Sequence, residues 1–231
     1  MFGVDPLYWM LMAPVFAFSL WASFKVKSSF KKFSQVGSRS GMTGAQVAEL
    51  ILQRNGLGHV PVLETTGFLS DHYDPMKKVI KLSPEVFGSN SLASIGVAAH
   101  ETGHAIQHAK GYKALMLRNT LAPTASIGSN FAWIIIFVGF MLGTLGLVKI
   151  GILLFSVVVV FQLITLPVEF NASSRAKEML ASYGILGASE MAGVSKVLSA
   201  AAMTYVAAAA SAIVTLLYFL IRSGILGGRD D

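Results

Sequence analysis

Residues 131–168 read FAWIIIFVGFMLGTLGLVKIGILLFSVVVVFQLITLPV, and this stretch decides the fold. It is almost continuously apolar, and as a single helix it would measure about 57 Å, nearly twice the roughly 30 Å of a bilayer's hydrocarbon core. The run must therefore turn, and three glycines and a lysine gather between positions 143 and 151, where a turn is needed. We expect a helical hairpin of two membrane spans, at about 128–145 and 150–168.

Two further apolar runs are long enough to cross a membrane. Residues 6–24 form the first. Asp5 precedes it, in place of the basic residues with which a cleaved signal peptide begins, and this favours a retained span. Residues 200–221 form the last, an alanine-rich run without a charged residue, whose length favours a fourth span over a helix in a soluble core. The sequence therefore predicts about four transmembrane helices.

The composition of the 231-residue chain also indicates a membrane protein. Apolar residues make up 54% and charged residues only 13%, whereas soluble domains carry about a quarter charged residues. The chain has no cysteine, which excludes a disulfide framework, a cysteine-ligated zinc site and a thiol nucleophile. Basic residues beside the spans explain the net charge of +6, so we expect a lipid bilayer and no nucleic acid among the partners.

The basic residues further predict the orientation. Twelve Lys and Arg residues lie between the first and second spans and three between the third and fourth, whereas three fall on the other side. Residues next to a span end count most in the positive-inside rule, and four lysines between positions 25 and 32 directly follow the first span. We expect a multi-pass protein of the cell (inner) membrane with its active site on the cytoplasmic side.

Residues 40–126 are the only long stretch with the composition of a soluble segment, and we expect them to form a single domain with the spans, over residues 1–231. Capping and helix-breaking residues predict helices at about 43–55, 91–109 and 112–121. Short apolar runs predict two strands at 60–63 and 78–82, the basis for a small hairpin, and the polar segment 71–75 between them is expected to be a turn.

His100-Glu101-Thr102-Gly103-His104 matches the pattern H-E-x-x-H inside the helix expected at 91–109. Residues four apart project from one helix face, so both imidazoles can bind one Zn²⁺. Glu101 is offset by about 100° round the helix, where its carboxylate can act as general base toward a zinc-activated water that attacks a peptide carbonyl. The motif predicts a zinc metallopeptidase; the alternative is a helix with two surface histidines and an unrelated glutamate.

Catalytic zinc takes three protein ligands and keeps one open position. His108 extends the same helix face, but it lies eight residues, about 12 Å, from His100, which is too far for one metal. Glu169 at the end of the third span is favoured, because an acid there needs a partner and two crossings return it to the membrane face of His104. The carboxylates that remain open are Glu178 in second place, Glu190, Glu64, Asp71, Asp74 and Glu85.

Three segments carry a family likeness: DHYDP at 71–75 with KLS at 81–83, GVAAHETGHAIQ at 96–107, and LPVEFNAS at 166–173. They resemble the bacterial membrane-bound neutral zinc metallopeptidases of the YugP-like type, and the likeness extends over nearly the whole chain and the order of its spans. The resemblance implies a gluzincin arrangement, in which His100, His104 and Glu169 bind Zn²⁺ and Glu101 is the general base.

A wider resemblance is to the HtpX and CAAX-type membrane proteases, whose second signature usually carries an acidic residue one turn after the ligand glutamate. Ser173 stands at that position, so the group that supports the zinc-binding histidines stays open. The family also suggests that the strand near Val79–Leu82 pairs with an extended substrate. His72 and Tyr73 are candidates for hydrogen bonding to the transition state, or form a structural turn. Arg175 is a candidate for a carboxylate or substrate contact, or for an interfacial anchor.

Taken together, these patterns predict a mainly α-helical membrane protein with about four transmembrane helices and a small zincin-like module, built from the H-E-x-x-H helix and a short β-hairpin. We expect a zinc-dependent endopeptidase whose partners are a peptide or membrane-protein substrate and the bilayer. The alternative is a catalytically weak or inactive zinc-binding membrane scaffold or quality-control adaptor. A metal transporter is disfavoured because the middle parts of the spans contain almost no ionisable groups.

Overall fold

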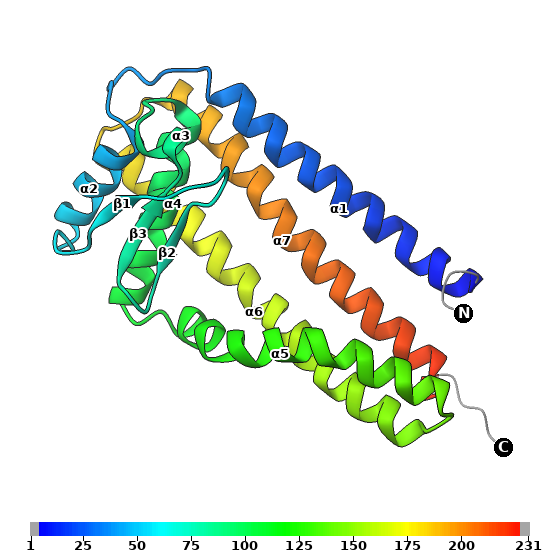
Figure 1. Ribbon diagram of the computed structural model, residues 1–231. Helices are drawn as coiled ribbons and strands as arrows, with labels where there is room; N and C mark the ends of the chain where they lie inside the picture. Colours follow the sequence, from blue (N-terminus) through cyan, green and yellow to red (C-terminus); the bar gives the residue numbers. More distant parts are fainter. Residues whose placement is uncertain (1–4, 227–231) are drawn as a thin grey trace. The chain divides into compact units, whose positions relative to one another are not determined.

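The computed structural model describes residues 5–226, which are mainly helical (Figure 1). The elements in chain order are α1 (Pro6–Phe33), α2 (Gly44–Arg54), β1 (Val62–Glu64), β2 (His72–Asp74), β3 (Val79–Leu82), α3 (Pro84–Phe87), α4 (Leu92–Ala109), α5 (Lys113–Met141), α6 (Leu145–Ser182) and α7 (Ala188–Arg222). Four helices, α1, α5, α6 and α7, are long and apolar enough to cross a membrane, as the sequence predicted. The chain divides into two compact units, and each of these four helices contributes residues to both.

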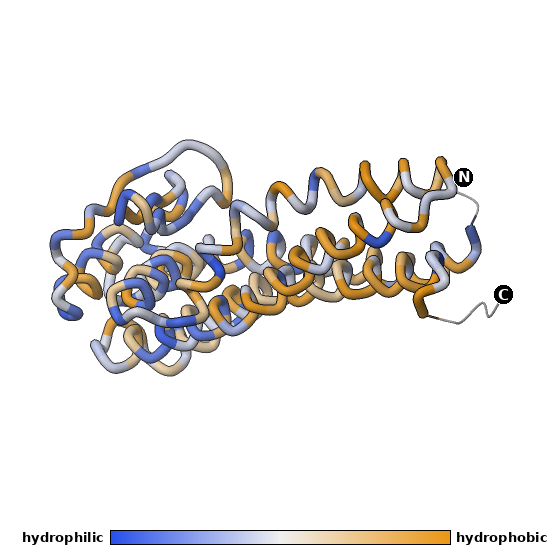
Figure 2. Tube along the Cα trace, turned by 90° about the horizontal axis from the view of Figure 1, so that it is seen from below, coloured by the Kyte–Doolittle hydropathy of each residue, from blue (hydrophilic) through white to orange (hydrophobic). Residues whose placement is uncertain are grey.

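The first unit contains residues 5–22, 116–167 and 204–226 of the described chain. Large apolar side chains are exposed on its surface; Phe16 is 63% exposed and Leu153 is 69% exposed. Hydrophobic residues predominate along these helical stretches (Figure 2). Such a surface is costly in water and favourable in hydrocarbon, so this unit suits a lipid bilayer.

The turn between α5 and α6 lies at residues 142–144. Gly143 has a φ of +63°, which only glycine adopts without strain. Gly151 lies inside α6, where a Cβ atom would collide with Ile136 of α5. The predicted glycine cluster therefore has two roles, since one member forms the turn and another allows close helix packing. Because the turn lies at Gly143 and not later in the cluster, α6 begins at Leu145, ahead of the expected position near 150.

The helix predicted at 112–121 is not a separate element, because α5 continues through Pro123 to Met141. Proline lacks the N–H that bonds the carbonyl four residues earlier, and it usually ends or kinks a helix. In an apolar segment, however, the surrounding backbone groups are best satisfied by intrahelical hydrogen bonds, and this favours one continuous helix.

The second unit contains residues 23–115 and 168–203, and its sheet has the strand order β1-β3-β2. The two strands predicted at 60–63 and 78–82 are present as β1 and β3. They are parallel neighbours, with Val62 opposite Ile80, and so do not form the hairpin themselves. The central position of β3 explains its burial, since three of its four residues are buried.

The antiparallel hairpin consists of β2 and β3, with Tyr73 opposite Ile80. The prediction of a turn over the polar segment 71–75 was therefore wrong, because this segment contains β2. Its composition indicates a turn, but tertiary contacts make it a strand. The carboxylate of Asp71 accepts hydrogen bonds from the N–H and hydroxyl of Ser83, which ties the start of β2 to the end of β3.

Helix α4 runs through the core of the second unit. Ser91 caps its N-terminus by accepting a hydrogen bond from the Ser94 N–H, as predicted. Ile95 and Ile106 belong to an apolar cluster with residues of α2, α6 and α7, whereas Ala98 belongs to a second cluster that includes β3. The helix is therefore held by packing on more than one side, which limits how far its side chains can shift.

Helices α4 and α6 approach each other closely at Gly103. A Cβ atom at this position would lie 2.7 Å from the carbonyl oxygen of Ala172, closer than such atoms pack. Glycine is therefore required for the observed spacing between the helix that carries HETGH and the helix that carries Glu169.

Candidate metal centre

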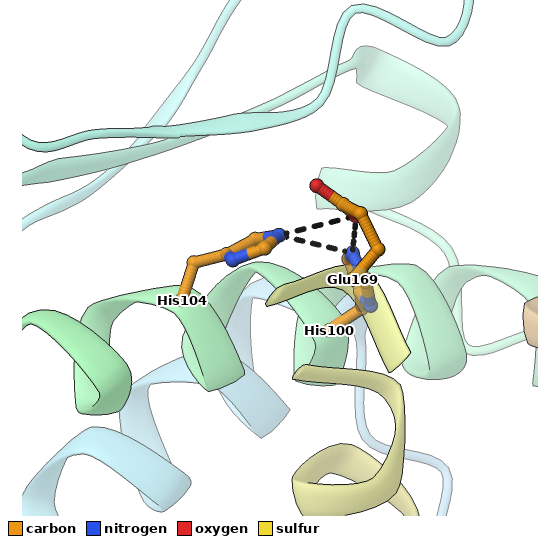
Figure 3. Close-up of side chains that lie close together, drawn as sticks. All are labelled: His100, His104 and Glu169. Carbon is orange, nitrogen blue, oxygen red and sulfur yellow. Dashed lines mark hydrogen bonds and ion pairs between the residues drawn. The ribbon is translucent and has the colours of Figure 1, made fainter. Parts of the chain in front are cut away.

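Two histidines of α4 and one glutamate of α6 converge on one point (Figure 3). His100 and His104 are one helical turn apart, so their imidazoles project from the same face. Their Nε2 atoms are 3.1 Å apart, and the Oε2 atom of Glu169 lies 3.2 Å from His100 Nε2 and 3.6 Å from His104 Nε2. The structure thus brings together the three residues that the sequence predicted as metal ligands.

The chemistry of these three groups fits Zn²⁺. Two imidazole nitrogens and one carboxylate oxygen form a common donor set of catalytic zinc, which leaves a fourth position for water or substrate. Their ligand atoms all lie within 4.8 Å of one another. Glu169 is only 2% exposed, and a carboxylate buried to this extent is costly unless a positive partner compensates it. The three residues could therefore hold one zinc ion.

Each histidine also uses its second ring nitrogen. His100 Nδ1 lies 3.1 Å from the hydroxyl of Ser173, and His104 Nδ1 lies 3.0 Å from Oε1 of Gln107. Zinc-binding histidines nearly always have such a partner, which orients the ring. The sequence left this partner open, and Gln107 was not among the predicted site residues. Its signal was an amide three residues after His104, on a buried face of the same helix.

The electrostatics of His104 reflect its neighbours. Burial lowers the pKa of His104, but the hydrogen bond to Glu169 and the negative charges of Glu101 and Glu169 outweigh burial and raise this pKa above its ordinary value. The surroundings of this imidazole therefore favour positive charge. A divalent cation would be attracted by the same two carboxylates.

Glu101, the predicted general base, is buried in α4, and its carboxylate is held by the neighbouring sheet. Its Oε2 atom accepts a hydrogen bond of 3.0 Å from the backbone N–H of Tyr73. In the antiparallel pairing of β2 with β3, successive residues direct their N–H groups to opposite edges. The Tyr73 N–H is thus on the edge of β2 that faces α4, where it can fix one oxygen of Glu101.

Tyr73 contacts α4 at a second point through its side chain. Its hydroxyl lies 2.8 Å from Nδ1 of His108, and the two rings pack edge to face. Burial is the main cause that raises the pKa of Tyr73, and the charge of Asp74 adds to it, so the hydroxyl keeps its proton at neutral pH. His108, which its spacing excludes as a third ligand, thus has Tyr73 as a neighbour through both its ring and its Nδ1 atom.

Asp71 supports the same strand. Burial raises the pKa of Asp71, while the two hydrogen bonds from Ser83 oppose this rise and the charge of Glu101 adds to it. The carboxylate of Glu101, which accepts the Tyr73 N–H of β2, is thus also a negative neighbour of Asp71. Asp71 lies directly before β2, where it binds Ser83, and it does not belong to the group of His100, His104 and Glu169.

The structure places the remaining candidates as follows. His72 is exposed, with its Nδ1 2.8 Å from the carbonyl oxygen of Ser70. Arg175 donates from Nε to Oδ1 of Asn171 at 2.8 Å, so this guanidinium nitrogen contacts an amide and not a carboxylate. Glu190 accepts hydrogen bonds from the backbone N–H groups of Arg39 and Gly187, and Glu178 is exposed on α6.

The expectation that the strand near Val79–Leu82 pairs with substrate is not met, because β3 is the central strand of the sheet. Both of its edges already pair, one with β1 and the other with β2. An added strand needs an unpaired edge. The central place of β3 follows from the pairing of the polar segment as β2, which the sequence analysis read as a turn.

Comparison with known proteins identifies the family to which the chain belongs. The family model described as "Putative neutral zinc metallopeptidase" matches residues 8–224. The chain belongs to this family. It is also 49% identical over 225 residues to a protein of Bacillus subtilis (strain 168) named "Putative membrane protease YugP", a match that covers 97% of this chain and 99% of that protein. No solved structure was found to match the chain.

Membership of the neutral zinc metallopeptidase family identifies Zn²⁺ as the cofactor, in agreement with the donor set of His100, His104 and Glu169. The relative's name and the four apolar helices together support membrane association. The roles of the individual residues rest on geometry and chemistry.

Proposed function

We propose that this chain is a membrane-embedded zinc-dependent endopeptidase of the H-E-x-x-H, gluzincin type. The observation that carries the proposal is the convergence of His100, His104 and Glu169 from two helices, with Glu101 buried beside them. In this proposal the first three residues hold the metal. Zn²⁺, when bound there, supplies Lewis acidity that lowers the pKa of a water and polarises a peptide carbonyl.

Glu101 acts as the general base. Its carboxylate accepts a proton from the water molecule as the water oxygen attacks the carbonyl carbon of the scissile bond. The hydrogen bond from the Tyr73 N–H holds Oε2, and this leaves Oε1 to receive that proton. The protonated Glu101 then donates to the leaving nitrogen, so that the C–N bond breaks and yields a carboxylate and an amine.

Tyr73 is the candidate for contact with the polarised carbonyl. Tyr73 contacts α4 at two residues: its N–H donates a hydrogen bond to Glu101, and its hydroxyl contacts Nδ1 of His108. By helical periodicity Glu101 and His108 share one face of α4, about 10 Å apart along the axis. A phenol that keeps its proton can donate to an oxygen that gains negative charge. We propose substrate contacts further from the metal for His72 and Arg175.

We further propose a multi-pass arrangement in the cell (inner) membrane with the site on the cytoplasmic side. Helices α5 and α6 form two successive crossings, so the residues before α5 and those after the apolar part of α6 lie on one face of the bilayer. This arrangement suits a substrate that is a cytoplasm-facing peptide or a membrane protein, and the bilayer is the second partner.

The variant Glu101→Gln tests the mechanism. Glutamine has the same shape and can still accept from the Tyr73 N–H, but it cannot take up a proton. We expect unchanged zinc content and a roughly 10²–10⁴-fold slower cleavage of fluorescently labelled casein by the detergent-solubilised chain. The proposal is wrong if the variant cleaves at the wild-type rate. If the wild type binds zinc but cleaves nothing, the scaffold alternative is favoured.

A further inference from the structure

Gln107 is a buried amide with a full set of partners. Its side chain is inaccessible to solvent, at 0% exposed. Its Nε2 donates to the carbonyl oxygen of Val168 at 2.8 Å and to Oδ1 of Asn171 at 3.0 Å, both on α6, and its Oε1 lies 3.0 Å from Nδ1 of His104. One side chain thus joins a histidine of α4 to the backbone of the helix that carries Glu169.

The orientation of this amide follows from its neighbours. A backbone carbonyl can only accept a hydrogen bond, so the nitrogen of Gln107 must face Val168. Its oxygen must then face His104. An amide oxygen can only accept, and therefore Nδ1 of His104 carries the proton in this contact. In a neutral imidazole the other nitrogen, Nε2, is then unprotonated and has a free lone pair.

A second contact fixes the same orientation. Oδ1 of Asn171 accepts from Gln107 Nε2 and, at 2.8 Å, from Nε of Arg175. A guanidinium group can only donate, so the Asn171 oxygen must point to it. Two groups of fixed polarity therefore lie at the start of this series of hydrogen bonds. They are the guanidinium of Arg175, which only donates, and the backbone carbonyl of Val168, which only accepts. These two groups fix the amide of Gln107, and its oxygen then places a proton on Nδ1 of His104.

We propose that Gln107 is a positioning residue that holds His104 in the Nδ1–H tautomer and so presents its Nε2 lone pair to the metal. Asn171 and Arg175 support this role by fixing the amide of Gln107. The inference rests on the proposed function, in which His104 binds Zn²⁺. It also gives Arg175 a role that differs from the substrate contact predicted from the sequence.

His100 provides the contrast. Its Nδ1 partner is the hydroxyl of Ser173, which can donate or accept, so this contact specifies no tautomer. Of the two Nδ1 atoms, only that of His104 has a partner of fixed polarity. We therefore place the stronger orienting contact at His104.

The first test is spectroscopic and needs no metal. The full-length apo protein, with ¹⁵N-labelled histidine and in detergent micelles, is examined by long-range ¹H–¹⁵N NMR at a pH where His104 is neutral, and the His104 signals are assigned from a His104→Asn variant. We expect protonation on Nδ1 in the wild type. A wild-type His104 that carries its proton on Nε2 would overturn the inference.

The second test measures zinc affinity by competition with a chromophoric chelator. We expect Gln107→Leu to bind zinc about 10–100-fold more weakly, the loss typical for an outer partner of a zinc-binding histidine. Thr102→Val is the matched control, because Thr102 is equally buried in α4 but donates only to the carbonyl oxygen of Ala98. This control should bind zinc as the wild type does.

A third variant separates positioning from packing. Asn171→Leu should weaken zinc binding less than Gln107→Leu, because Val168 still orients the amide. When it is added to Gln107→Leu it should cause no further loss, since both substitutions act through one contact. Additive losses, or wild-type zinc affinity in Gln107→Leu, would overturn the inference. A wild-type protein that takes up no zinc would instead contradict the proposed function, while the NMR measurement still decides the tautomer of His104.

Discussion

Glu169 is the residue on which the proposed metal site depends most at the scale of a single side chain. It lies almost fully buried between two imidazoles, with contacts of 3.2 and 3.6 Å. We expect Glu169→Gln, which keeps the shape and removes the charge, to weaken zinc binding by more than the ~10–100-fold typical for an outer partner. Zinc content after dialysis and chelator competition measure this loss.

Glu178 is the control for this prediction. It lies on the same helix, it is exposed, and it was the second choice for the third ligand from the sequence. Glu178→Gln should bind zinc as the wild type does. If Glu178→Gln loses zinc and Glu169→Gln retains it, the assignment of the third ligand must be reversed.

Ser173 leads to a weaker prediction. Its hydroxyl orients His100, but it fixes neither the tautomer nor the direction of the hydrogen bond. We expect Ser173→Ala to lower zinc affinity by about tenfold or less, at the lower end of the range for outer partners. The loss should be smaller than that of Gln107→Leu in the same competition assay. A larger loss would mean that His100 depends on its partner more than His104 does.

Much of the candidate site was predictable from single residues, whereas the groups that orient it were not. His100, Glu101 and His104 follow from helical spacing, and Glu169 follows from the cost of an acid at the end of a span. Gln107 was missed because its role depends on a partner 61 residues away on another helix, the carbonyl of Val168. Sequence spacing within one helix says nothing about such a contact.

At the scale of elements, the packing of α4 against α6 sets the geometry of the site. Gly103 stands between the two histidines, where a Cβ atom would lie 2.7 Å from the backbone oxygen of Ala172, three residues after Glu169. Backbone cannot move aside as a flexible side chain can. We expect Gly103→Ala to push the helices apart, destabilise the protein by about 1–3 kcal/mol and reduce zinc affinity. Thermal unfolding and chelator competition measure both effects.

Gly96 offers the matched control on the same helix. A Cβ atom there would lie 3.0 Å from a methyl group of Val194 on α7, a contact that a side chain can relieve. Gly96→Ala should therefore leave zinc affinity unchanged and cost less stability, in part because alanine favours the helix. Equal zinc loss in the two variants would show that the α4–α6 spacing is not what holds the site together.

The elements themselves were predictable to different degrees. The apolar parts of the long helices follow from their length, and the start of α4 follows from the cap at Ser91. Helices α1, α6 and α7 extend beyond the predicted spans, to Phe33, to Ser182 and from Ala188, where the sequence is more polar. Strand β2 was missed because its residues, His72–Asp74, have the composition of a turn and gain their strand conformation only by pairing with β3. This single error also misplaced the free edge of the sheet.

At the scale of the whole molecule, two quantities decide where the site operates: the number of crossings and the distribution of basic residues. An even number of crossings separates α4 from the end of α6 if α5 and α6 each cross once, and the excess of Lys and Arg on that side favours the cytoplasm. Both halves of the candidate metal centre then share one compartment, which is a condition for any joint metal binding.

The absence of cysteine makes this topology directly testable, since a single introduced thiol is the only one in the chain. Thr144 lies in the exposed turn between α5 and α6, and Ser182 is exposed at the end of α6. In intact bacterial cells, with the outer membrane opened where there is one, a membrane-impermeant maleimide should label Thr144→Cys. It should label Ser182→Cys only after the inner membrane is permeabilised. The opposite pattern would place the metal centre outside the cytoplasm and reverse the class of substrate, and labelling of both in intact cells would contradict two crossings between the halves of the site.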